Sequence, residues 1–138
     1  MKVNSLRHVG IVTSKIEESI CFYRDLGFEV YWDKNETSQF INTILGESID
    51  YLRTVKMKND NFSIELLDFN STCNITDFNI TSHVITHISV DVEDIRKLFS
   101  KNQHLFKSEP QLTSDKKALV AFMKDPNNSL FLELVQVL

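Results

Sequence analysis

The chain has 138 residues, of which 42% are hydrophobic and 25% charged, as expected for one globular domain of ordinary size. A net charge of −4 argues against a nucleic-acid-binding surface, which needs clustered Lys and Arg. No apolar stretch approaches the ~20 residues that cross a bilayer, and the N-terminus has no signal-peptide pattern. Two cysteines are too few to indicate a disulfide framework. These features predict a cytoplasmic protein with no membrane partner.

The first half of the chain predicts a strand, a helix and further strands. Aliphatic and β-branched residues favour a strand over Leu6–Thr13. Ser14, with Glu17 three residues later, predicts the capped start of a helix that ends near Leu26, with Gly27 as its C-cap. Within this helix Cys21 is expected to pack in the core. The rest of this half predicts a strand over Phe28–Trp32 and a hairpin over Tyr51–Phe69, while Asp33–Ser48 has no clear pattern.

The second half repeats this plan after a polar linker. Asn70–Thr81 has neither helical nor strand periodicity and is expected to join the halves. Asp125–Asn128 is expected to form a turn. The predicted elements of this half are a strand over His83–Val90, a helix over Val92–Asn102 and strands over Lys117–Lys124 and Ser129–Val137. The order βαβββ therefore occurs twice in the chain, which is itself a fold signal.

Each half also carries one His and one Glu at matching places in its strands. Side chains alternate between the two faces of a strand, so His8 and Glu65 lie opposite the branched aliphatic residues of their strands. His87 and Glu133 do the same in the second half. An unpartnered carboxylate among apolar residues is costly. Two imidazoles and two carboxylates could satisfy one another around a divalent cation such as Zn²⁺, Ni²⁺, Co²⁺, Mn²⁺ or Fe²⁺.

The chain resembles the vicinal oxygen chelate superfamily, which includes glyoxalase I, methylmalonyl-CoA epimerase, extradiol dioxygenases and the bleomycin and fosfomycin resistance proteins. The resemblance begins with R-H-V-G-I and S-I-C-F-Y-R-D-L-G-F, within Arg7–Phe28. It continues with S-I-E-L-L at Ser63–Leu67, and with Ile85–Ile95 together with the closing Phe131–Leu134. It implies an α+β domain spanning residues 1–138. It also implies that an Asn of the turn Asp125–Asn128 takes the left-handed backbone conformation that Gly has in the family's usual Asp-Pro-x-Gly turn. Two tandem βαβββ modules, about 4–69 and 82–138, would form a curved mixed sheet around a central metal-binding cavity.

By position, the resemblance implies that His8, Glu65, His87 and Glu133 are the metal ligands of a glyoxalase-I-type member. The leading hypothesis is a lactoylglutathione lyase-like lyase or isomerase that transfers a proton next to a carbonyl through a metal-bound enediolate. Its substrate would be a small molecule with two adjacent oxygens. Glu133 is the first candidate for the catalytic base and Glu65 the second. Among the four arginines, Arg7 and Arg53 are the candidates for substrate contacts.

Two alternatives stay open at this point. An Fe(II) extradiol-type dioxygenase would use only His8, His87 and Glu133, with Glu65 as a bystander. A non-catalytic protein that binds a small molecule such as an antibiotic would line its pocket with Trp32, Tyr51 and phenylalanines. Family members usually pair as homodimers, and the resemblance leaves open whether the metal site lies within one chain or across the dimer interface.

Overall fold

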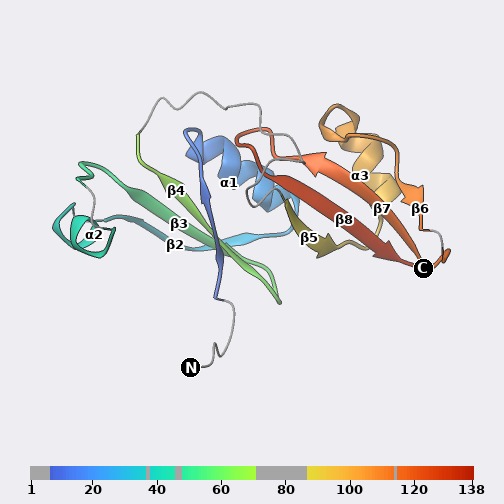
Figure 1. The fold of residues 1–138 in the computed structure, drawn as a ribbon, viewed down its shortest axis with the longest axis horizontal. Coiled ribbons are helices and arrows are strands. Elements are labelled where there is room, and N and C mark those ends of the chain that lie inside the picture. The colour runs from blue at the N-terminus through green and yellow to red at the C-terminus, as the bar shows by residue number, and fades with distance from the viewer. Residues whose placement is uncertain (1–6, 37, 46–47, 71–86, 114) are drawn as a thin grey trace. The chain divides into compact units, whose positions relative to one another are not determined.

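The computed structural model describes residues 7–36, 38–45, 48–70, 87–113 and 115–138 (Figure 1). The chain divides into two compact units, Met1–Asn74 and Ile75–Leu138, and each is described by itself. Each unit has the predicted order of a strand, a helix and three further strands. The predicted α+β fold with two tandem βαβββ modules is therefore confirmed. The assignment of both modules to one domain stays a prediction.

The first unit is a four-stranded mixed sheet with a helix packed against it. Its elements are β1 (Val9–Val12), α1 (Ile16–Asp25), β2 (Glu29–Asn35), α2 (Ser38–Leu45), β3 (Arg53–Lys58) and β4 (Ser63–Asp68). The strand order is β1-β4-β3-β2, in which β1 and β4 are parallel and the other pairs antiparallel. α1 contacts β4 and β2. The helix thereby brings apolar cover to one face of the sheet, and α2 lies in the segment where the sequence shows no clear pattern.

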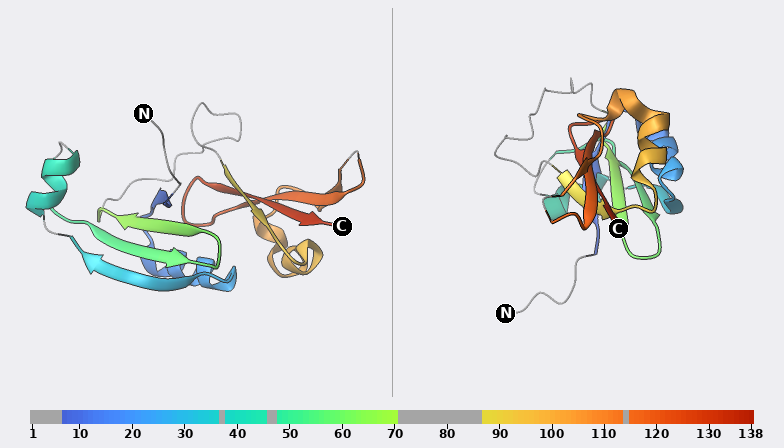
Figure 2. Two further views of the ribbon diagram at one scale, coloured as in Figure 1. Left: turned by 90° about the horizontal axis from the view of Figure 1, so that it is seen from below. Right: turned by 90° about the vertical axis from the view of Figure 1, so that its right-hand side faces the viewer.

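The second unit repeats this topology with a shorter edge strand. Its elements are β5 (His87–Asp91), α3 (Ile95–Asn102), the 3₁₀ helix η1 (Gln103–Leu105), β6 (Gln111–Leu112), β7 (Ala118–Lys124) and β8 (Phe131–Val137). The strand order is β5-β8-β7-β6, again with one parallel pair, β5 and β8. α3 contacts β7 and β8 and lies along this sheet in Figure 2. Each module therefore places its first and last strands side by side.

Burial alternates along the last strand of each module. In β4, Ile64 and Leu66 are fully buried, whereas Glu65 between them is only partly buried. In β8, Leu132 and Leu134 are buried on either side of the partly exposed Glu133. Successive side chains of a strand point to opposite faces. Both carboxylates therefore lie on the face of their own sheet that is turned away from the apolar core.

Only the C-terminal end of α1 agrees with the prediction from the sequence. Gly27 follows the helix with a φ of 90°, a left-handed conformation that suits glycine. The predicted start at Ser14 is wrong, because Lys15 occupies the N-cap position without a capping side chain. The Thr13 hydroxyl instead accepts a hydrogen bond from the Lys15 amide and bonds the buried Ser19 hydroxyl. The helix start is thus held by Thr13, which follows β1, and not by a capping box.

Two further expectations are also wrong. Cys21 is exposed, since it lies one position beyond Ile20 on α1 and therefore turns away from the buried side. In the turn before β8, neither Asn127 nor Asn128 has a positive φ. Both asparagines instead bind the buried Asp125: the Asn127 amide and the Asn128 side-chain nitrogen donate to its carboxylate at 2.9 and 2.7 Å. Most of the predicted linker lies outside the described residues, as does the start of the strand predicted over His83–Val90.

Candidate functional site

The first candidate pair joins the start of β1 to the middle of β4. His8 directly precedes β1, and its Nε2 atom lies 3.0 Å from Oε2 of Glu65. The side chains are 32% and 17% exposed, so both are sheltered but open to a ligand. Gly10 of β1 stands opposite Glu65 in the parallel pair. The sequence-predicted partners of the first module are therefore in contact.

The second pair has the same place in its own sheet. The Nε2 atom of His87 on β5 lies 3.7 Å from Oε2 of Glu133 on β8. This separation is too long for a hydrogen bond between these two atoms. The edge of the His87 ring also meets Phe122 of β7, with 5.4 Å between the ring centroids. The side chains of His87 and Glu133 are 39% and 28% exposed, so this pair is more open than the first.

Both pairs have the donor atoms of metal ligands, and the first pair also has their spacing. Imidazole nitrogen and carboxylate oxygen bind Zn²⁺ and other divalent transition ions at about 2.0–2.2 Å, which puts adjacent ligand atoms roughly 2.8–3.6 Å apart in octahedral or tetrahedral geometry. The first pair falls at this spacing at 3.0 Å, and the second is slightly wider at 3.7 Å. Taken unit by unit, the described residues bring no third His, Cys, Asp or Glu beside either pair. The convergence of both pairs on one ion stays a prediction.

Lys56 is a neighbour of this site that the sequence analysis did not identify. Its ammonium Nζ lies 3.4 Å from Oε1 of Glu65, the carboxylate oxygen not used by His8. Lys56 stands opposite Glu65 in the antiparallel β3–β4 pair, so the contact follows from the register. Strand alternation alone would have placed Lys56 on one of two faces, but only the pairing of β3 with β4 reveals its partner. Glu65 is thus held from both sides.

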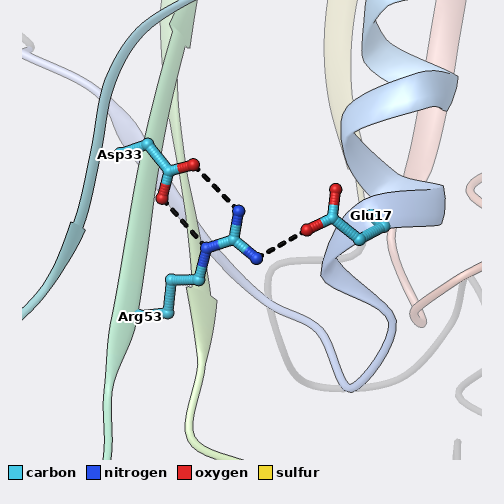
Figure 3. Close-up of polar contacts among 3 residues, drawn as sticks. All are labelled: Glu17, Asp33 and Arg53. Carbon is cyan, nitrogen blue, oxygen red and sulfur yellow. Dashed lines mark hydrogen bonds and ion pairs between the residues drawn. The ribbon is translucent and has the colours of Figure 1, made fainter.

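Arg53, one of the two arginines predicted to contact substrate, has another role (Figure 3). Its guanidinium donates two hydrogen bonds to Asp33 on β2, at 2.9 and 2.8 Å, and one to Glu17 on α1, at 2.6 Å. Arg53 shares its strand face with the buried Val55, and Glu17 belongs to the helix that covers this face. The Arg53 side chain therefore lies on the face opposite Glu65, where its hydrogen bonds connect α1 to the sheet.

The ion pairs of Arg53 also shift the pKa values of Asp33 and of Arg53 itself. The hydrogen bonds from Arg53 lower the pKa of the Asp33 carboxyl below its ordinary value of 3.8. The same bonds, with Asp33 first and Glu17 second, raise the pKa of the Arg53 guanidinium further above its ordinary range. Arg53 therefore keeps its charge under all ordinary conditions, and that charge is neutralised within the first unit. Arg7 is exposed beside His8.

Comparison with known proteins identifies the family of this chain. The model of the Glyoxalase/Bleomycin resistance protein/Dioxygenase superfamily matches residues 5–131. No curated protein sequence matches the chain significantly. Within the described residues, none of the helices is long and apolar enough to span a membrane.

Solved structures of this family have the same fold. A glyoxalase family protein from Bacillus cereus is 16% identical and superposes with a TM-score of 0.87 over 100% of this chain and 97% of its own. The trypanothione-dependent glyoxalase I of Leishmania major is 20% identical, with a TM-score of 0.64 over 96% and 87% of the two chains. The fosfomycin resistance protein FosX of Listeria monocytogenes, in complex with Mn(II) and sulfate, is 10% identical, with a TM-score of 0.63 over 99% and 95%. At these identities the likeness is one of fold. With the family model matching most of its length, the chain belongs to the glyoxalase/bleomycin resistance protein/dioxygenase superfamily.

Proposed function

We propose that this chain is a metal-dependent lyase or isomerase of the glyoxalase I type, which moves a proton between neighbouring carbons beside a carbonyl. The observation that supports this proposal is the His–Glu pair in each module, which lies on the face of the sheet that is turned away from the apolar core (the core-averted face). The distances are 3.0 Å for His8 and Glu65 and 3.7 Å for His87 and Glu133. A protein that only sequestered a ligand would have no need for the same two metal-binding residue types at matching places.

His8, Glu65, His87 and Glu133 would hold one divalent cation, of nickel, zinc, cobalt, manganese or iron. When bound, such a cation supplies Lewis acidity, which stabilises negative charge on substrate oxygens. The Mn(II) complex of the structurally similar FosX supports a divalent ion on this fold. The substrate would be a small molecule with two adjacent oxygens, because both oxygens would have to bind the same cation.

Glu133 is the residue that would carry the proton. It would accept the proton from the carbon next to the carbonyl and return it to the neighbouring carbon, so that no external acid or base is consumed. The structure supports this choice over Glu65. Lys56 and His8 hold the two oxygens of Glu65, at 3.4 and 3.0 Å. Glu133 faces the apolar Phe122 across the β7–β8 pair and has a longer contact to its histidine, so it is freer to move.

The working form would be a cytoplasmic homodimer. The exposed thiol of Cys21 is free, which suits a reducing compartment. Light scattering coupled to size-exclusion chromatography measures the assembly directly and should give twice the chain mass of 16.0 kDa.

Metal content and oxygen uptake test the proposal together. Protein purified without chelator should contain nickel, zinc, cobalt or manganese. The loaded protein should isomerise hemithioacetals formed from α-ketoaldehydes and low-molecular-mass thiols without consuming oxygen. Iron with oxygen uptake on a catechol would instead support ring cleavage with His8, His87 and Glu133. Failure to bind any of these metals would contradict the enzyme proposal and leave a small-molecule-binding protein.

A further inference from the structure

A row of functional side chains crosses the core-averted face of the first sheet. Glu65 on β4 stands opposite Lys56 on β3, and Lys56 stands opposite Trp32 on β2. With His8 beside Glu65, the row runs from the candidate metal ligands to β2, the outermost strand of this sheet. Trp32 is 44% exposed, although a large aromatic side chain has much to gain from burial. The row therefore joins the candidate metal ligands to an exposed indole ring.

A β-bulge brings a second aromatic side chain to this edge. The register of β2 against β3 shifts between Val30 and Trp32, so Tyr31 is an extra residue in the strand. Its hydroxyl lies 3.0 Å from the hydroxyl of Ser63, which shares a strand face with Glu65. Tyr31 is 48% exposed. Bulges redirect side chains and occur often beside active sites. Here the bulge puts two adjacent aromatic residues on the face of the candidate ligands.

Two lysine ammonium groups lie close to the indole ring of Trp32. The Nζ atoms of Lys34 and Lys56 lie 5.6 and 5.8 Å from the centroid of the Trp32 ring, which is within the range of a cation–π interaction. Glu65 offsets the charge of Lys56, but in the part of the chain that the structure describes Lys34 makes no ion pair. The charge around Trp32 is therefore positive, and binding of a metal by Glu65 would make it more so.

The described residues of the second module, 87–113 and 115–138, place no cation opposite Glu133. Phe122 on β7 stands opposite Glu133, as Lys56 stands opposite Glu65 in the first module. The ring of Phe122 contacts the candidate ligand His87. The repeated plan thus requires a His and a Glu in both modules, but it does not require a cation next to the Glu. At this register position Lys56 of the first module is replaced by Phe122 in the second, which suggests that Lys56 serves to select the ligand and not to build the fold.

We infer that Trp32, Lys34 and Lys56 form a subsite for the carboxylate of a small organic acid with a flat, apolar body. The ammonium groups would bind the carboxylate, and the exposed indole ring would contact the apolar part. This inference deepens the proposed function, on which it rests for the claim that the bound acid is the substrate. Arg53 does not supply this charge, because it is bound to Asp33 and Glu17 on the opposite face.

The protein contains one tryptophan, so fluorescence excited at wavelengths that only tryptophan absorbs reports on this subsite. Phenylacetate is the probe, and the uncharged phenylacetamide is its matched control. Titration with phenylacetate should change the Trp32 emission and saturate, with phenylacetamide binding at least about fivefold more weakly. Lys56→Met should weaken phenylacetate binding by a similar factor and leave phenylacetamide binding within about twofold. Lys101→Met, at an exposed position on α3, removes the same charge elsewhere and should change neither.

Several outcomes would overturn the subsite. These are equal binding of the two probes, no saturable response, or unchanged phenylacetate affinity in a folded Lys56→Met protein. Should Lys56→Met not fold, as judged by circular dichroism, Lys34→Met provides the same comparison from the sheet edge. Calorimetric titration with nickel chloride separates this inference from the proposed function. Charge-selective probe binding without metal binding would support the subsite and contradict the enzyme, and metal binding without charge selectivity would do the reverse.

Discussion

His8 and Glu65 are 57 positions apart in the sequence, yet the imidazole Nε2 lies 3.0 Å from the carboxylate Oε2. The parallel pairing of β1 with β4 produces this contact, because it sets the first strand of the module beside the last. The same pairing of β5 with β8 produces the contact between His87 and Glu133. The topology of the module thus makes a two-residue binding element out of sequence-distant parts.

The first prediction is that metal stabilises the folded chain through these histidines. A ligand that binds only the folded state adds about 2.7 kcal/mol to stability when it is present at about 100 times its Kd. Nickel chloride should therefore raise the melting temperature of the chelator-treated protein, and His8→Ala or His87→Ala should remove most of that increase. His104→Ala, in the exposed η1, is the matched control and should respond like the wild type. An unchanged response of both ligand variants would contradict the metal assignment.

The second prediction concerns the catalytic base. Glu133→Gln keeps the size and shape of the side chain but cannot accept a proton, so turnover should fall by at least about 10² while the melting curve stays close to that of wild type. Glu65→Gln should affect metal affinity more than the proton-transfer step, because Lys56 and His8 hold that carboxylate. Steady-state kinetics at saturating metal measures both variants. Near-normal turnover of Glu133→Gln would exclude Glu133 as the base.

The third prediction is a pH-dependent contribution of Asp33 to stability. Arg53 lowers the pKa of Asp33 in the folded state, so this carboxylate stabilises the fold at pH values above its ordinary pKa of 3.8. The contribution is lost as the pH falls through the lowered pKa. Since the Asp33 side chain is 43% exposed, we expect Asp33→Asn to cost only about 0.5–1 kcal/mol at neutral pH. Urea denaturation at a series of pH values measures it.

Asp60→Asn, at an exposed turn, is the control for this series because it removes the same charge without the Arg53 contact. The stability curves of wild type and Asp33→Asn should converge in acid, whereas those of wild type and Asp60→Asn should stay close throughout. Curves of wild type and Asp33→Asn that run parallel down to the most acidic pH would show that the ion pair does not couple to folding.

The fourth prediction compares the turns that lead into β4 and β8. Asp125 is fully buried and accepts hydrogen bonds from Asn127 and Asn128, so Asp125→Ala leaves buried donors unpaired and should cost about 2–3 kcal/mol. Asn59 makes two similar bonds in the exposed turn before β4, where water can replace them. Asn59→Ala should therefore cost about 1 kcal/mol or less. Equal costs in chemical denaturation would show that burial of Asp125 is not what makes its turn important.

The sequence by itself predicted the architecture because its signals are local. Alternation in S-I-E-L-L and F-L-E-L places each Glu opposite two buried aliphatic residues, and this period is a property of a single strand. The same holds for Gly27, whose left-handed conformation ends α1. The helix start at Lys15 was less predictable, because the hydroxyl of Thr13, which follows β1, accepts the Lys15 amide in place of the capping box proposed for Ser14 and Glu17.

Only the tertiary structure decided which side chains meet across strands. The pattern of β3 gives Arg53 and Lys56 opposite faces, but nothing local shows that Arg53 binds Asp33 and Glu17 while Lys56 binds Glu65. Those contacts depend on strand order and register. A shift of one residue, like the bulge at Tyr31, moves every later side chain to the other face. The residue types of each His–Glu pair could therefore be predicted from the sequence. Which other side chains contact the pair was decided by strand pairing between segments that are distant in the sequence.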